Sequence, residues 1–308
     1  MMRNFREYLV LILKGMGMGA SDVVPGVSGG TIAFITGIYE ELINSIKSIN
    51  LEAVKLLFRL QFKEFWKKIN ANFLIAVFSG ILISIFTLAN LLEFLLINYP
   101  VLVWSFFFGL VIASAIYILS DIKKVDWKTI FSFLAGFGIA FWITTITPAQ
   151  TSEAYWFILL SGSVAICAMI LPGISGSFIL LLLGKYQFIL NAVSEFKMDV
   201  LGIFVVGAVV GLIAFSNFLS WLLRKFRYET IALLAGFMGG SLNKIWPWKE
   251  TTETYIDRHG LEQPLTQRNV WPELALDSDL IPAFMIAAFG FSLIFIIIRL
   301  TKVKKHKV

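Results

Sequence analysis

The chain has 308 residues, of which 58% are hydrophobic and only 15% are charged. Soluble domains carry roughly a quarter charged residues, so this composition excludes an ordinary soluble domain. The net charge of +6 does not indicate a nucleic-acid partner, because Lys and Arg occur in short clusters beside apolar stretches, as they do in membrane proteins. The single cysteine and the two histidines exclude an intrachain disulfide and a Cys/His metal cluster. We therefore expect neither a metal nor a cofactor.

The first predicted element is a hairpin over residues 8–46, broken in the middle by Pro25-Gly26-Val27-Ser28-Gly29-Gly30. Pro25 ends one helix, because proline lacks an N–H and the residue before it avoids the α region. Gly26 permits the turn, and Ser28 can cap the helix that follows.

Apolar stretches follow, each close to the roughly 20 residues that a helix needs to cross a membrane. In the first unit, residues 1–150, the predicted spans are 73–96, 101–120 and 129–145. The second unit, residues 151–308, has the same order of elements. It contains a hairpin over 154–195, spans at 201–223, 231–246 and 281–300, and a polar loop at 247–280 to which we assign no role.

The two units share motifs in register, which predicts an internal repeat. The broken segment at Pro25 recurs 147 residues later as Pro172-Gly173-Ile174-Ser175-Gly176-Ser177. At the same offset Gly37 and Tyr39 match Gly184 and Tyr186, and further matches such as Gly80 with Gly207 occur at an offset of 127. Chance rarely matches proline, glycine and tyrosine in register.

Basic clusters predict the orientation, because cytoplasmic loops carry an excess of Lys and Arg. This rule assigns both termini to the cytoplasm and the acidic loop 247–280 to the outside. These assignments agree with one another only if each hairpin leaves the membrane on the same side from which it entered. The sequence thus predicts an all-α polytopic membrane protein of two inverted repeats, each a re-entrant broken-helix hairpin plus three transmembrane helices, as in many secondary transporters.

The two breaks would place helix N-termini at mid-membrane depth, where free N–H groups and a partial positive charge favour anions such as phosphate. Glycines there leave the backbone open to a ligand, and hydroxyl groups add donors. The candidate phosphate-binding residues are Ser28, Gly29, Gly30, Thr31, Ser175, Gly176, Ser177, Lys14 and Lys185. The helix breaks are assigned to Pro25, Gly26, Pro172 and Gly173. The alternative, in which these residues only kink the helices and let them pack closely, stays open.

Two acidic residues of the first hairpin, Asp22 and Glu40, are candidates for carrying a coupling proton or cation. A charge in an apolar segment is costly, so it is expected to have a use. A pair between Asp22 and Lys14 is the alternative for that carboxylate, and a solvated interfacial position is the alternative for Lys185.

The stretch from Lys14-Gly15 to Asp22-Val23-Val24-Pro25-Gly26-Val27-Ser28-Gly29-Gly30-Thr31, followed by Gly37-Ile38-Tyr39-Glu40, closely resembles the bacterial polyprenyl-phosphate transporter family. Leu171-Pro172-Gly173-Ile174-Ser175-Gly176-Ser177 and Gly184-Lys185-Tyr186 resemble its second signature. The resemblance covers almost the whole chain. It implies a transporter in the bacterial plasma membrane, not an enzyme. The implied substrate is undecaprenyl phosphate, the lipid carrier of cell-wall synthesis, moved from the outer to the inner leaflet for reuse.

The residues alone leave other functions open. A secondary transporter of a small soluble anion shares the predicted architecture. A membrane lipid phosphatase would need a histidine beside a basic cluster, and His259 and His306 lie in polar stretches. The sequence also leaves open the oligomeric state and whether an H+ or Na+ gradient drives transport by alternating exposure of one central site.

Overall fold

The computed structural model describes residues 3–24, 26–149, 151–256, 262–272 and 279–302. Five helices in these ranges are long and apolar enough to cross a membrane. They are α6 (Ala71–Asn98), α7 (Pro100–Ser120), α8 (Trp127–Thr145), α12 (Met198–Lys225) and α14 (Leu280–Lys302). Each agrees with a predicted span to within three residues at either end, so the prediction of a helical multi-span membrane protein is confirmed.

The sixth predicted span, 231–246, differs from the helix found there. Helix α13 (Arg227–Ser241) begins earlier and has only 15 residues. At ~1.5 Å per residue it rises about 22 Å, which is less than the ~30 Å hydrocarbon core. Gly239 and Gly240 weaken its last turn, the Ser241 hydroxyl donates to the Met238 carbonyl at 2.8 Å, and the chain then turns before Pro247.

Each hairpin contains three helices rather than the two arms expected from the sequence. The first consists of α1 (Phe5–Val23), α2 (Gly29–Ile35) and α3 (Tyr39–Lys47). The second consists of α9 (Tyr155–Ile170), α10 (Gly176–Leu182) and α11 (Tyr186–Ser194). Pro25 lies outside the described residues, whereas Pro172 lies in the break between α9 and α10.

Glycines in the left-handed region mark both breaks of each hairpin. Gly26 and Gly173 have φ of 87° and 92° at the breaks that the sequence predicts. Gly37 and Gly184 have φ of 72° and 61° at the second breaks, and the chain bends by 107° between α10 and α11. The matched Gly37 and Gly184 were the sequence signal for these bends, because an isolated glycine after an apolar helix often ends it.

The bounds of the elements recur at the two sequence offsets. Adding 147 to the bounds of α2 and α3 gives those of α10 and α11, and adding 127 to the bounds of α6 gives those of α12. The order of elements is therefore the same in both units. The inversion of one unit relative to the other in the membrane stays a prediction.

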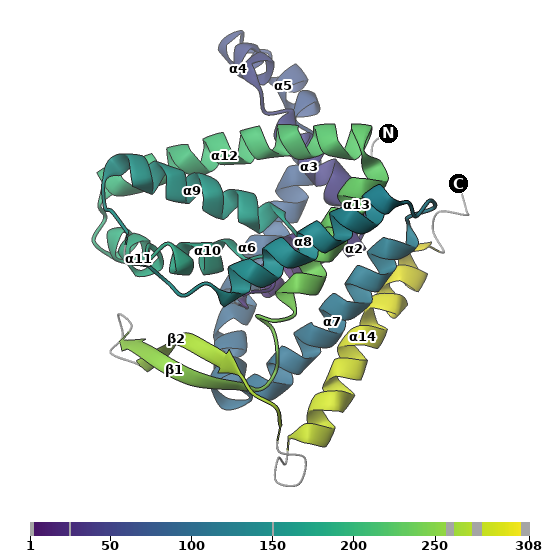
Figure 1. Ribbon diagram of the computed structural model, residues 1–308. Helices are drawn as coiled ribbons and strands as arrows, with labels where there is room; N and C mark the ends of the chain where they lie inside the picture. The colour runs from purple at the N-terminus through teal and green to yellow at the C-terminus, as the bar shows by residue number, and fades with distance from the viewer. Residues whose placement is uncertain (1–2, 25, 150, 257–261, 273–278, 303–308) are drawn as a thin grey trace.

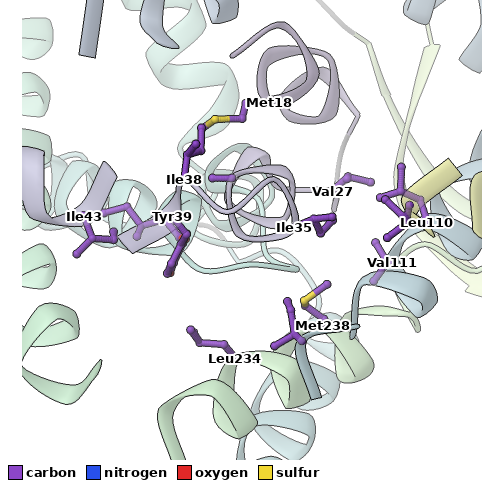
Figure 2. Packing of buried hydrophobic residues seen from close by; sticks show 14 of the residues in the cluster. Met18, Val27, Ile35, Ile38, Tyr39, Ile43, Leu110, Val111, Leu234 and Met238 are labelled. Carbon is purple, nitrogen blue, oxygen red and sulfur yellow. The ribbon is translucent and has the colours of Figure 1, made fainter. Parts of the chain in front are cut away.

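Helix packing joins the two units through equivalent pairs. Within the units, α1 packs against α6 and α9 packs against α12. Between the units, α7 packs against α14 and α8 packs against α13 (Figure 1). Buried side chains of the first hairpin, including Ile35 and Tyr39, share one cluster with those of α7 and α13, such as Leu110 and Met238 (Figure 2). The first hairpin therefore sits in the centre of the core.

Two accessory elements lie at opposite ends of the molecule. Helices α4 (Leu51–Phe58) and α5 (Phe62–Lys68) project at the top of Figure 1, and strands β1 (Lys249–Ile256) and β2 (Glu262–Asn269) lie at the bottom. The strands pair in antiparallel fashion. The sequence analysis did not predict them, because the loop 247–280 lacks the apolar alternation of a buried strand.

Candidate functional site at the broken hairpins

The first break brings a carboxylate to the N-terminus of α2. The Gly29 N–H donates to Asp22 Oδ1 at 2.7 Å, and the Gly30 N–H donates to Ser28 Oγ at 3.0 Å. Ser28 therefore caps α2 as its position in the motif predicts. Two of the N–H groups expected to be free for a ligand are paired within the protein, one of them with an anionic group of the chain itself.

Hydrogen bonds connect the first hairpin to the second across the centre of the molecule. The Ser28 hydroxyl donates to the Met169 carbonyl at 3.0 Å, and the Tyr39 hydroxyl donates to the Ile170 carbonyl at 3.1 Å. In the opposite sense, the Gly173 N–H donates to Thr31 Oγ1 at 3.1 Å. The structure thus brings the two sequence-predicted motifs together at one place, with α2 next to α9.

The second break differs from the first in its capping. The hydroxyl groups of Ser175 and Ser177 lie 2.7 Å apart and form a hydrogen bond with each other, and Ser175 makes no side-chain cap to α10. Met169 occupies the position that matches Asp22, so α10 has no equivalent of that carboxylate. The two N-termini are equivalent in backbone but not in charge.

The glycines of both motifs allow close backbone approach. A Cβ on Gly29 would lie 2.6 Å from Asp22 Oδ2, and one on Gly30 would lie 2.6 Å from the Ile170 carbonyl oxygen. A Cβ on Gly176 would lie 2.8 Å from the Ala165 carbonyl oxygen. Such contacts support the packing role that was the alternative for these residues, and they mean that larger side chains there would disturb the fold as well as any ligand.

Lys14 lies in α1 and reaches the second bend of the first hairpin with its side chain, whereas Lys185 lies at the second bend of the second hairpin. Lys14 Nζ donates to the Thr36 carbonyl at 2.6 Å, at the end of α2. Lys185 is only 2% exposed, and its ammonium donates to the Thr151 carbonyl at 2.8 Å. Lys185 is therefore buried rather than interfacial. A phosphate contact for either lysine stays a prediction.

Glu40, the second coupling candidate, forms an ion pair with Arg227 at 2.7 Å, and both side chains are about half exposed. The pair lies beside a cavity of about 220 Å³ between α3 and the junction of α12 with α13. Asn44, Ser220 and Arg224 also line this cavity. Glu40 is thus a surface ion pair that ties the first hairpin to the second unit.

Lys244 and Lys249 are not among the site residues expected from the sequence. Lys244 follows α13, and a Cβ on Gly26 would lie 2.8 Å from its Cγ atom. Lys249 begins β1, and its buried ammonium stands 3.4 Å from the centre of the Trp104 ring. The sequence signal was available, because the positive-inside rule assigns lysines to the cytoplasm and these two flank the predicted outer end of a span.

Interrupted backbone at the centre of a helical membrane protein is tolerated only where it is buried in protein or lines a cavity. Five spanning helices around two broken hairpins define the class as a multi-span membrane protein with the helix breaks of a transporter. Among the residues that the structure describes, no group of three or more His, Cys, Asp or Glu side chains could hold a metal ion.

Comparison with known proteins agrees with this class. The model of a family described as VCA0040-like, undecaprenyl phosphate translocase-like, matches residues 18–263. The chain is 49% identical over 266 residues to a protein of Vibrio cholerae serotype O1 named polyprenyl-phosphate transporter, a match that covers 86% of each chain. It is 36% identical over 259 residues to a protein of Staphylococcus aureus with the same name, covering 77% of this chain and 85% of the relative. No solved structure shows a significant match.

The chain therefore belongs to the undecaprenyl phosphate translocase-like family, and it is a transporter rather than an enzyme.

Proposed function

We propose that this protein transports undecaprenyl phosphate from the outer to the inner leaflet of the bacterial plasma membrane, for reuse in cell-wall synthesis. The observation that carries the proposal is the 49% identity, over 86% of the chain, to a relative named polyprenyl-phosphate transporter. The substrate has a phosphate monoester head, which suits helix N-termini and hydroxyl donors, and an apolar tail that can stay in the lipid while the head crosses.

The proposed headgroup site includes the N-termini of α2 and α10, with Ser28, Thr31 and Ser175 as hydroxyl donors. The Asp22 carboxylate occupies the Gly29 N–H at 2.7 Å when no ligand is bound. Protonation of that carboxylate would weaken the bond and release the N–H for an anionic ligand. In this mechanism Asp22 carries the coupling proton, because loading the phosphate and protonating Asp22 favour each other.

Alternating access is proposed to arise from two units of opposite orientation. The contact between α3 and α12 would form the closed side. There the Ser220 hydroxyl donates to Asn44 Oδ1 at 3.1 Å, and Lys47 Nζ donates to the same Ser220 hydroxyl oxygen at 3.3 Å. The Glu40–Arg227 ion pair adds a charged contact nearby. Breaking these few polar contacts would let the first hairpin move away from the second unit and expose the central site to the cytoplasm.

Reconstitution in liposomes tests the function. Leaflet exposure of labelled polyprenyl phosphate, uptake of soluble phosphate and release of inorganic phosphate from the lipid would be followed on the same preparation. The proposal expects protein-dependent movement of the lipid without the other two activities. Uptake of soluble anion with a stationary lipid would instead identify a soluble-anion transporter, and release of inorganic phosphate would identify a phosphatase.

A further inference from the structure

Two lysine side chains outside the motifs discussed so far, Lys244 and Lys249, lie on the short segment that leads from α13 into β1. The stem of Lys244 lies against the first break at Gly26, and its ammonium stands 4.7 Å from the centre of the Phe178 ring of α10. The ammonium of Lys249 stands over Trp104 of α7. The pair therefore touches the first hairpin, the second hairpin and a spanning helix at once.

The buried ammonium of Lys249 has no hydrogen-bond partner among the described residues. Its burial and the neighbouring Lys244 ammonium hold the pKa of Lys249 well below its ordinary value. The carboxylate next to it in sequence is engaged elsewhere, because Glu250 pairs with Arg268 at 2.8 Å. Burial of an ammonium without a partner is costly and a second cation nearby adds repulsion, so both effects favour the uncharged amine. An aromatic face compensates for only part of this cost.

The position of Lys249 is fixed by the surrounding contacts. Asn269, its register partner on β2, donates from Nδ2 to the carbonyl and the side-chain oxygen of Asn243 at 2.8 and 2.9 Å. The Trp246 indole N–H donates to the Val270 carbonyl at 2.9 Å. These bonds attach the strand pair to the end of α13 and fix the chain segment that carries both lysines.

We propose that Lys244 and Lys249 form a binding site for a phosphate monoester dianion at the end of the molecule that carries the strand pair. A dianion next to both lysines would favour their charged forms and supply the missing partner of Lys249 through charge-assisted hydrogen bonds. Inorganic phosphate and the head of a prenyl phosphate lipid share this chemistry. The assignment of the lipid rests on the transport function proposed above.

The test uses the purified full chain in detergent, with inorganic phosphate and a soluble short-chain prenyl phosphate as the two probes. Binding is followed by the thermal unfolding midpoint and by tryptophan fluorescence, because Trp104 lies directly under Lys249. Lys244→Met and Lys249→Met remove the charges at nearly constant length. Lys128→Met is the matched control, because that exposed lysine stands 5.9 Å from the centre of the Trp127 ring.

Both probes are expected to raise the unfolding midpoint of the native protein and of Lys128→Met. Affinity is expected to fall about tenfold or more in each lysine-site variant. If one variant does not fold, the affinity of the other variant and the phosphate titration of the native protein decide whether the site exists. A native protein without any phosphate-dependent change, or site variants with unchanged affinity, would overturn the site even if lipid transport is intact. Binding of inorganic phosphate that the prenyl phosphate does not displace would keep the site and remove the support for lipid transport.

Discussion

At the scale of a single residue, substitution of Asp22 can separate its observed hydrogen bond from Gly29 from its proposed role as a proton carrier. Asparagine keeps an oxygen that can accept the Gly29 N–H, which lies 2.7 Å from the carboxylate, but it cannot titrate. We expect Asp22→Asn to fold and to exchange labelled lipid between leaflets, while accumulation driven by an imposed pH gradient is lost. Gradient-driven transport in proteoliposomes measures this, and a native dependence on the gradient in Asp22→Asn would exclude the proton-carrier role.

Asp22→Ala is the matched comparison, because alanine removes the acceptor as well as the charge. Loss of a helix cap costs about 0.5–2 kcal/mol, so Asp22→Ala should unfold at a lower temperature than Asp22→Asn. Equal unfolding midpoints would mean that the bond to Gly29 contributes little to stability.

Thr31 joins the two hairpins through one buried hydrogen bond from the Gly173 N–H at 3.1 Å. Thr31→Val preserves the shape of the side chain but leaves that N–H without a partner. The expected destabilisation is about 1–3 kcal/mol, measured by thermal unfolding in detergent. In the control Thr36→Val, at the end of α2, the lost hydroxyl donates only to carbonyls of that helix, to Ile32 at 2.7 Å and to Ala33 at 3.4 Å. We expect this change to cost about 0.5 kcal/mol or less. Equal effects would contradict the connecting role of Thr31.

At the scale of elements, the second bend of each hairpin depends on backbone conformation. Gly37 has φ of 72°, and a Cβ there would meet no atom within 4 Å. Gly37→Ala should therefore cost about 1–2 kcal/mol through the left-handed conformation alone. Gly138 in α8 also has open space around a Cβ, and Gly138→Ala should be neutral or stabilise by up to about 1 kcal/mol. The unfolding midpoint should fall for Gly37→Ala, whereas it should stay unchanged or rise for Gly138→Ala.

The contact between α3 and α12 provides a second element-scale prediction. The Glu40–Arg227 pair is about half exposed, so it contributes about 0–1 kcal/mol to stability. Glu40→Arg and Arg227→Glu should each leave the unfolding midpoint nearly unchanged but alter the transport rate, because like charges now face each other in the closed contact. The double variant should restore the rate. Native rates in both single variants would remove this contact from the transport cycle.

Element positions followed from the sequence wherever hydrophobicity alone decides them. The five long helices lie where apolar stretches of about 20 residues predict spans, and the breaks at Gly26 and Gly173 follow from their motifs. The short α13 and the bends at Gly37 and Gly184 did not follow, because glycine inside an apolar run is compatible with both a continuing and an ending helix.

The sequence also predicts the candidate site only in part. The sequence pattern predicted two motifs, each followed by the N-terminus of a helix. The structure brings these motifs together through hydrogen bonds of Ser28 and Thr31. The partners of those N-termini depend on tertiary contacts that one sequence does not specify. The Asp22 bond to Gly29 is of this kind, and so is the contact of Lys249 with Trp104. Lys249 meets Trp104 of α7 in a structure where the strand pair of a polar loop is bonded to the end of α13.

At the scale of the whole molecule, the equivalent helix pairs suggest how motion could pass between units. Helices α7 and α14 pair across the units in the same way as α13 and α8. Each unit thereby contributes its last two helices to two interfaces with the other unit, and neither interface contains a helix of a broken hairpin. These two interfaces can therefore stay intact while the first hairpin moves in the transport cycle proposed above.

The orientation of the molecule in the membrane is the prediction on which the inverted arrangement depends. Helices α4 and α5 lie at one end and the strand pair at the other (Figure 1), and the basic residues of 47–68 assign the first end to the cytoplasm. Single cysteines in a Cys167→Ser background, at the exposed Lys63 of α5 and the exposed Thr252 of β1, test this by labelling from either side with a membrane-impermeant maleimide. We expect Lys63→Cys to react only from the cytoplasm and Thr252→Cys only from outside.

Serine at position 167 is a mild background change, because the thiol lies 3.6 Å from the Gly211 carbonyl oxygen and a hydroxyl can donate to the same atom. Reaction of both cysteines from the same side would require an even number of crossings between them, and two units of three crossings in opposite orientation would then be impossible.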